Sequence, residues 1–338
     1  MPKIRFFTKA DNLPPNTTEK KLKSKEKYQL TNWPQYNKAL VNRGFATLWL
    51  TEKTLAQWYY KGPRKRGGVF RFSDSCIQAV LAIKAVFRLA FRQTQGLIKS
   101  LLSMMKVDMQ VPSYSQICRR QIHLQTFKAP SNPVKNQAEP IHLVVDSTGL
   151  KVYGEGEWKV RKHGADKRRI WRKLHLVADE ATNIIHAVEL TSHSTSDAEM
   201  VKPLLDATEW RISKLSGDGA YDQVKVYDDL ETRQIRPLIL PRSNAVIWND
   251  ENGHSLVHPR NESITKIRII GIREWKSQIG YHRRSKAETA MFRWKAIFGE
   301  RLWARLLTNQ KAEAQIKTFC LNQFVKLGMP KAIKLVPK

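Results

Sequence analysis

Two aspartates stand at the ends of predicted strands, where an acidic side chain is well placed for chemistry. Asp146 follows the apolar run "HLVV", and Asp218 lies in "SGDGAYD" after a second short strand. Functional groups of open α/β sheets gather at strand ends, and a carboxylate buried there is costly unless something pairs with it. A single strand-ending aspartate is often only a turn former. The two together predict a pair of carboxylates at one edge of a sheet.

Asp222, in the same segment, is the alternative to Asp218 as the second acid. It is expected one turn into the following helix, where a negative charge suits the helix dipole. Asp218 is preferred because it lies at the strand tip between two glycines, which allow a tight turn and a close backbone approach.

A third acid, Glu288, lies in the basic segment "YHRRSKAETAMFRWK" at residues 281–295. A helical rotation of about 100° per residue puts four of its side chains on one stripe, namely Tyr281, Arg284, Glu288 and Lys295. Arg283 and Arg293 lie off the stripe, so we expect them to serve affinity for an anionic substrate rather than the chemical step. The alternative is a solvated basic helix in which Glu288 only pairs with Arg284 at i−4.

These residue types suit chemistry on phosphodiesters. Carboxylates supply the hard oxygen ligands that Mg²⁺ prefers, and two such ions activate the attacking oxygen and stabilise the leaving oxygen of a phosphodiester. Arg284 is suited to grip a phosphate bidentately and Lys295 to act as a point charge, while Tyr281 could hydrogen-bond a phosphate or stack on a base. The pattern therefore predicts a Mg²⁺ site with the three acids as ligands.

The charge balance favours a nucleic acid as the partner. The chain has 338 residues, with 59 Lys and Arg against 30 Asp and Glu, and a formal net charge of +29. Such an excess makes the compact state repel itself unless a polyanion is bound. An anionic membrane surface would call for a basic amphipathic helix or a lipid anchor, and the sequence displays no clear case of either. DNA and no membrane are the expected partners.

Two segments are predicted to contact DNA. The block "KVRKHGADKRRIWRK" at 159–173 follows Asp146, and its density favours a DNA-facing ribbon over a solvent loop. Its expected contacts are Arg161, Lys162, Arg168 and Arg169. Short helices broken at 107–112 suggest a helix-turn-helix-like unit that ends in Arg119 and Arg120. A plain helical bundle is the alternative for that unit.

The cysteines and the N-terminus predict a cytoplasmic, nucleoid-associated protein. Cys76, Cys118 and Cys320 are far apart, which favours neither a disulfide framework nor a cysteine-based zinc site and fits a reducing cytosol. The N-terminus has no apolar signal-peptide core, and charged residues interrupt the longest apolar stretch.

The first part of the chain is predicted to be helical. Residues 1–27 are expected to form a disordered basic arm, with an ordinary frayed terminus as the alternative. Residues 28–126 are expected to form a helical DNA-binding region and residues 127–140 a proline-containing linker.

The second part is predicted to be an α/β domain at 141–300. Its elements follow the order three strands, helix, strand, helix, strand, with an irregular insertion at about 243–280. This order gives a mixed sheet in which an antiparallel hairpin meets parallel crossovers. Two helices, at about 301–308 and 309–327, and a tail close the chain over 301–338.

Three segments resemble the DDE-type insertion-sequence transposases of bacteria, in particular the insertion-sequence five family with its Tyr-Arg-Glu-Lys signature. They are "VVDSTGLKVYGEGEWK", "GDGAYD" and the helix with Tyr-x2-Arg-x3-Glu-x6-Lys spacing. The resemblance covers most of the chain and implies a ribonuclease-H-like catalytic domain behind a helical region that binds terminal inverted repeats.

The resemblance also implies an activity. It implies a Mg²⁺-dependent transposase, with Mn²⁺ able to substitute, that acts on double-stranded inverted repeats and target DNA as a homodimer on paired ends. The acids Asp146, Asp218 and Glu288 would be the catalytic metal ligands, and the other signature residues would contact transposon-end DNA. Related transposases wedge a tryptophan beside a flipped base, for which Trp275 is the candidate, with plain packing over the insertion as the alternative.

Two other functions stay open. One is a ribonuclease-H-like metal nuclease that cleaves DNA without strand transfer. The other is a non-catalytic DNA-binding regulator that uses only the helical N-terminal half, and variants of such a protein that lack the acids should behave like the wild type.

Overall fold

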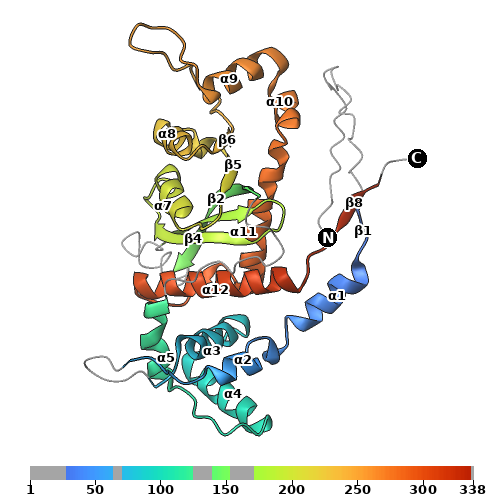
Figure 1. The fold of residues 1–338 in the computed structure, drawn as a ribbon, viewed down its shortest axis with the longest axis vertical. Helices are drawn as coiled ribbons and strands as arrows, with labels where there is room; N and C mark the ends of the chain where they lie inside the picture. The colour runs from blue at the N-terminus through green and yellow to red at the C-terminus, as the bar shows by residue number, and fades with distance from the viewer. Residues whose placement is uncertain (1–27, 64–70, 125–138, 153–170, 336–338) are drawn as a thin grey trace, which may run out of the picture.

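A mixed six-stranded β-sheet lies at the centre of the fold (Figure 1). The computed structural model describes residues 28–63, 71–124, 139–152 and 171–335. The strands follow the order β4-β3-β2-β5-β6, and β7 pairs with β2. Their bounds are β2 Ile141–Val152, β3 Trp171–Asp179, β4 Ile185–Ser192, β5 Ile212–Gly217, β6 Arg236–Ile239 and β7 Arg301–Leu302.

The long strand β2 is where two kinds of strand pairing meet. It runs antiparallel to β3, which runs antiparallel to β4. It runs parallel to β5, which runs parallel to β6. The predicted order of three strands, helix, strand, helix and strand is therefore confirmed, as is the mixed sheet.

Helices cover both faces of the sheet, and each face has its own core. On one face lie α11 (Ser285–Phe298) and α12 (Leu307–Leu327), and on the other α7 (Val201–Asp206) and α8 (Val224–Thr232). Successive side chains of a strand point to opposite faces, so Val144 joins the core with α11 while Val145 joins the core with α7 and α8. None of the described helices combines the length and the apolar character needed to span a membrane.

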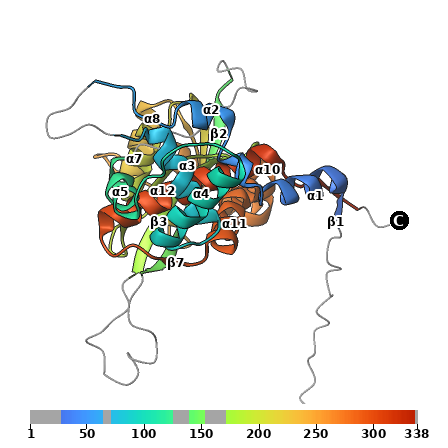
Figure 2. The same cartoon turned by 90° about the horizontal axis from the view of Figure 1, so that it is seen from below.

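The N-terminal helices share a core with the sheet. They are α1 Trp33–Asn42, α2 Glu52–Ala56, α3 Asp74–Val86, α4 Phe91–Met104 and α5 Tyr114–Arg120. The buried stripe of α3, including Ile77 and Val80, lies in one apolar cluster with Cys320 and Phe324 of α12. Figures 1 and 2 show α1 to one side of the other N-terminal helices, next to the short ribbon in which β1 (Tyr28–Leu30) pairs with β8 (Ala332–Lys334).

Two stretches differ from the sequence-based prediction. The insertion at 243–280, expected to be irregular, contains α9 (Pro259–Ile270) and α10 (Ile272–Gln278). Proline suits the first turn of a helix because its missing N–H has no partner there anyway. At the C-terminus the chain forms β7 and then one long helix, α12, rather than two helices.

Other predicted features lie outside the described residues. They are the basic arm at 1–27, nearly all of the linker at 127–140, and the part of the basic block that holds Arg161, Lys162, Arg168 and Arg169.

Candidate active site

Asp146 lies on β2, on the face that α11 covers. Its side chain is 18% exposed, and burial raises the pKa of Asp146 to about 6. The N–H of Ser147 donates to Oδ1 at 2.9 Å and lowers that pKa, as does the Arg284 guanidinium. The carboxylates of Asp218 and Glu288 raise it further, because like charges disfavour ionisation. Asp146 is therefore an acid whose charge needs a nearby cation.

Asp218 stands beside Asp146 because β2 and β5 pair in parallel. Val144 is level with Ser216 in that register, so two residues further along each strand Asp218 comes level with Asp146. Asp218 caps a short 3-10 turn, and its Oδ1 accepts the N–H of Ala220 at 2.9 Å. The cap orients the carboxylate and leaves its second oxygen for a ligand.

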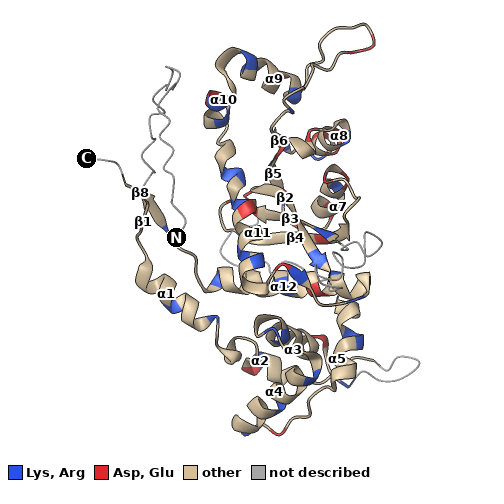
Figure 3. Ribbon diagram, turned by 180° about the vertical axis from the view of Figure 1, so that it is seen from behind, with Lys and Arg blue, Asp and Glu red and all other residues tan. Residues whose placement is uncertain are grey.

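Arg284 connects the helix acid with the strand acid. Its Nη2 donates to Oε1 of Glu288 one turn further on, and its Nη1 lies 3.9 Å from Oδ2 of Asp146. The i−4 pairing considered as the alternative for Glu288 is thus present, yet the same guanidinium also reaches the strand. Figure 3 shows the acidic position on α11 with basic positions near it, beside the central strands. A cation of the chain itself lies among the acids.

The signature segment is not one continuous helix, which corrects the predicted stripe. Residues Tyr281–Arg284 form a 3-10 turn, and α11 begins at Ser285. Arg284, Glu288 and Lys295 keep the helical spacing, whereas Tyr281 departs from it. The side chain of Lys295 is half-buried and forms no ion pair within the described part of the chain.

Tyr281 holds the Asp218 turn, which corrects its expected contact with a phosphate or base. It is 7% exposed, and its hydroxyl donates to the carbonyl oxygen of Gly217 at 3.2 Å. Burial raises the pKa of Tyr281 to about 12, so the hydroxyl stays protonated and keeps donating. Gly217 has no room for a side chain, since a Cβ there would lie 2.8 Å from Cδ2 of Tyr221.

Trp275, the candidate base wedge, packs inside the protein. It is 2% exposed, and its ring centroid lies 5.9 Å from that of Tyr281. A ring buried in this way has no face open to a base. In this structure Trp275 therefore packs inside the protein, as the alternative interpretation stated, and is not placed to wedge beside a base.

Asp222 is held in a structural ion pair and is not a rival ligand. Its side chain is 1% exposed, and its Oδ1 lies 2.6 Å from Nε of Arg260 on α9. The N–H of Arg242 donates to Oδ2 at 3.0 Å, and the Tyr227 hydroxyl donates to Oδ1 at 3.3 Å. Sequence reasoning missed Arg260, because nothing in its local pattern points to a partner so far along the chain.

The two arginines of the helix-turn-helix prediction have different surroundings. Arg120 is 8% exposed, and it donates to the carbonyl of Phe72 at 3.0 Å and to Asp74 at 2.5 Å. Arg120 was predicted to contact DNA, but in the structure its side chain holds the start of α3 instead. Arg119 is exposed at the end of α5 and stays a candidate.

The acid site has the donor chemistry for divalent cations but is not closed around one. Within the described ranges, no group of three or more His, Cys, Asp or Glu side chains converges on a metal position. Arg284 contacts both Asp146 and Glu288, and the Asp218 and Glu288 carboxylates raise the pKa of Asp146, so the three carboxylates lie in one neighbourhood. Hard oxygen donors of this kind suit Mg²⁺ or Mn²⁺.

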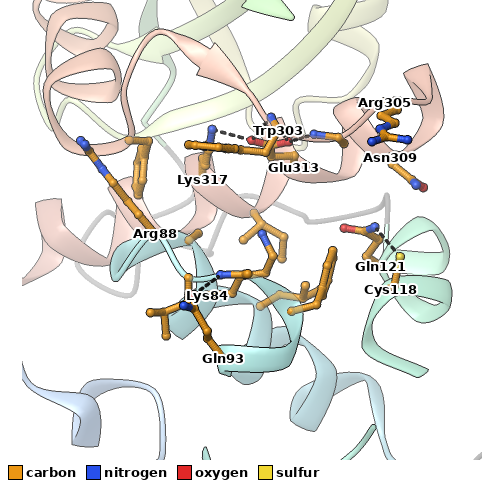
Figure 4. A pocket seen from close by; sticks show the side chains of 18 of the residues that line it. Lys84, Arg88, Gln93, Cys118, Gln121, Trp303, Arg305, Asn309, Glu313 and Lys317 are labelled. Atoms are coloured by element: carbon orange, nitrogen blue, oxygen red, sulfur yellow. Dashed lines mark hydrogen bonds and ion pairs between the residues drawn. The ribbon is translucent and has the colours of Figure 1, made fainter. Parts of the chain in front are cut away.

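A cavity of about 730 Å³ lies elsewhere, between α3, α4 and α12 (Figure 4). The only carboxylate among its lining residues belongs to Glu313, which accepts the N–H groups of Trp303 and Ala304 and pairs with Lys317 at 2.7 Å. The Glu313 carboxylate thus already has its hydrogen-bond and ion-pair partners, and the cavity is lined by none of Asp146, Asp218 and Glu288. The cavity is therefore distinct from the candidate active site.

The mixed sheet, with one aspartate on a central strand, a second just after the end of the parallel neighbouring strand and a glutamate on the covering helix, fits a ribonuclease-H-like catalytic fold. The chain belongs to the DDE transposases. A family model described as a transposase DDE domain matches residues 137–323, and a second model with the same description matches residues 41–155. Membership of this family implies a transposase that uses a divalent metal ion.

Among solved structures, the chain is similar to the piggyBac transposase in its synaptic complex with hairpin DNA. The two are 13% identical, the match covers 84% of this chain and 75% of that chain, and the TM-score is 0.37.

Proposed function

We propose that the chain is a Mg²⁺-dependent transposase of the insertion-sequence five type, which cuts double-stranded DNA at the inverted repeats of its element and joins the freed ends to target DNA. The observation that carries the proposal is the neighbourhood of three acids. Asp146 lies on β2, Asp218 directly follows the parallel strand β5, and Arg284 connects Glu288 with Asp146.

The three acids would hold the metal ions through carboxylate oxygens. When bound, such ions activate the attacking oxygen and stabilise the leaving oxygen of a phosphodiester. Arg284 neutralises Asp146 and Glu288 while no other cation is near. With a metal ion held by the three acids, Arg284 would no longer be needed to neutralise them, and its guanidinium would be free to grip a phosphate bidentately. Tyr281 keeps the Asp218 turn in place through its bond to the backbone.

The remaining parts of the proposal concern DNA. Water and then a freed 3′-hydroxyl attack phosphodiesters in line, with no covalent protein intermediate. Lys295, on the helical stripe of Glu288, and the exposed Arg119 are proposed DNA contacts. Mn²⁺ would substitute for Mg²⁺, and two copies would act on paired ends.

We expect Asp218→Asn and Glu288→Gln each to lower DNA cleavage on the order of a thousandfold or more, because each removes a charged oxygen ligand. Cleavage of a duplex carrying the element's inverted repeat is measured in Mg²⁺, with DNA binding measured in parallel. Glu199→Gln is the matched control, since Glu199 is an exposed acid beside α7 that pairs with Lys225. Cleavage at the wild-type rate by either site variant would remove that acid from the proposed site.

The same assay separates the alternatives. A metal nuclease would cut the duplex but fail to join a pre-cut end with a free 3′-hydroxyl to a second duplex. A regulator would cut nothing, and its Asp218→Asn variant would bind DNA as the wild type does.

Arg284→Gln should tighten the binding of Mn²⁺ several-fold. The guanidinium competes with a metal ion for Asp146 and Glu288, and removing a positive charge so close to them favours another cation. Isothermal titration calorimetry measures the affinity. Arg283→Gln is the control, because Arg283 pairs instead with Glu180 at 3.2 Å. Unchanged or weaker Mn²⁺ binding by Arg284→Gln would contradict the competition.

A further inference from the structure

Two arginines, one at the end of α1 and one on α11, lie close enough for their charges to interact, and neither forms an ion pair with another residue of the described ranges. Arg43 caps the end of α1, and Arg293 lies on α11 beyond Glu288. Nε of Arg43 and Nη2 of Arg293 are both buried and have no hydrogen-bond partner within the part of the chain that is described. Figure 3 shows basic positions at the end of α1 and along α11.

Among the described residues, Arg43 is held by contacts with groups that carry no negative charge. Its Nη2 donates to the carbonyl oxygen of Gly328 at 3.3 Å, and its guanidinium carbon lies 5.7 Å from the ring centroid of Tyr36 and 5.6 Å from that of Phe324. These contacts supply a carbonyl and two aromatic faces, which fix the guanidinium in place. They do not supply a negative charge.

Arg293 has a similar surplus of charge. Burial and the charge of Arg43 lower the pKa of Arg293 to about 10, although an arginine in a protein is ordinarily protonated well above that value. Two partly buried like charges repel each other, and each loses hydration. An anion between them would offset both costs, and the guanidinium fork matches phosphate and carboxylate groups.

We propose that Arg43 and Arg293 form a binding site for a backbone phosphate of DNA, an inference that rests on the proposed function. A carboxylate of the chain itself is the less suitable anion, since 30 acidic residues face 59 basic ones. Lys286 lies two helical turns before Arg293 on the same side of α11, about 10 Å along the axis. Lys286 is therefore a second cation that the same DNA strand could contact.

The pair is separate from the catalytic acids. Arg293 lies about 140° around α11 from Glu288. The phosphate that it binds is therefore one that flanks the reacting phosphodiester, and the site sets affinity and the path of the DNA rather than the chemical step.

The test combines DNA binding with thermal stability of Arg43→Gln, Arg293→Gln and the double variant. Binding of a labelled duplex of about 40 base pairs is followed by fluorescence anisotropy from about 50 to 200 mM salt. Each variant should lower the slope of log affinity against log salt by about one, and weaken binding several-fold at low salt. The melting temperature of the free protein should hold or rise, because each variant removes one of two repelling charges.

Arg233→Gln is the control for net charge. Arg233 follows α8 on the opposite face of the sheet, and its charge is already paired with Asp206 and Asp229. We expect the slope to stay at the wild-type value in this variant.

Three results would overturn the site. A lower melting temperature with an unchanged slope would make the pair structural. An unchanged slope with loss of a dimer in sedimentation would assign the anion to a carboxylate of a second copy. A wild-type protein that binds no DNA would remove both this site and the proposed function. A wild-type protein that shows the slope changes but cuts no DNA would remove the proposed catalysis and support the site.

Discussion

Asp146→Asn is expected to stabilise the metal-free protein at neutral pH while it abolishes DNA cleavage. The carboxylate lies mostly buried near Asp218 and Glu288, and burial raises the pKa of Asp146 to about 6. The difference between this pKa and that of an aspartate in the unfolded chain corresponds to about 3 kcal/mol of folding free energy, which is the cost of holding the charged form in the folded state. Asparagine keeps the shape and the acceptor for the N–H of Ser147 and removes this cost.

The sign of the pH dependence follows from the two pKa values of Asp146. The unfolded pKa is near 3.9 and the folded value is about 6, so the folded state holds more protons between them. The stability that Asp146 contributes is therefore present below about pH 4 and lost as the pH rises through about 6.

Thermal unfolding in EDTA measures the effect. The gain from Asp146→Asn should be small near pH 4, grow up to about pH 6 to 7 and then level off. Glu199→Gln, at an exposed acid, should show no such trend. A variant less stable than the wild type at pH 8 would contradict the buried-charge explanation. The expected gain in stability, together with the loss of cleavage, means that stability and activity change in opposite directions, as expected where an active site holds unfavourable charge.

The sheet was predictable because its signals are local. The hairpin strands β3 and β4 are apolar runs joined by a short turn, and the alternation of strand and helix after them leaves few topologies for a mixed sheet. The neighbourhood of Asp146 and Asp218 follows from the same reasoning, since each ends an apolar run and the two runs pair in parallel. The role of each acid in catalysis remains a prediction.

The surroundings of Tyr281 were not predictable from helical periodicity. A rotation of about 100° per residue assumes a continuous helix, but Gly280 adopts φ 66° and the next four residues form a 3-10 turn. The ring then turns inward toward Gly217, which is 64 residues away. Contacts over such a separation leave no periodic trace in the sequence.

Helix α9 was missed for a related reason. Its isoleucines do not form a buried stripe, since Ile264 is buried whereas Ile269 is 76% exposed. A helix without a clear apolar face lacks the periodic signal on which a prediction depends. Much of its attachment comes from Arg260, whose partner lies in the GDGAYD segment.

Arg260→Gln should lower the free energy of unfolding by about 3–5 kcal/mol, because it leaves the charge of Asp222 buried without a partner. Arg260 also donates to the carbonyl of Val246 at 2.7 Å, and its guanidinium carbon lies 4.2 Å from the ring centroid of Trp248. Its loss should therefore loosen the insertion as well as the turn that follows Asp218. Urea unfolding measures the first effect, and the rate of limited proteolysis within 243–280 measures the second.

The double variant Asp222→Asn with Arg260→Gln separates charge burial from packing. Removing both charges leaves no unpaired ion, so the double variant should recover a large part of the stability that Arg260→Gln loses. Lys225→Gln is the surface control, since its pair with Glu199 is largely exposed on both sides and should contribute less than about 1 kcal/mol. A double variant as unstable as Arg260→Gln would show that the guanidinium stabilises the insertion through Val246 and Trp248 rather than by neutralising Asp222. In that event the hydrogen bonds from the Arg242 N–H and the Tyr227 hydroxyl would be enough to stabilise the buried Asp222 carboxylate. The turn that carries Asp218 would then depend less on the insertion than the Asp222–Arg260 ion pair indicates.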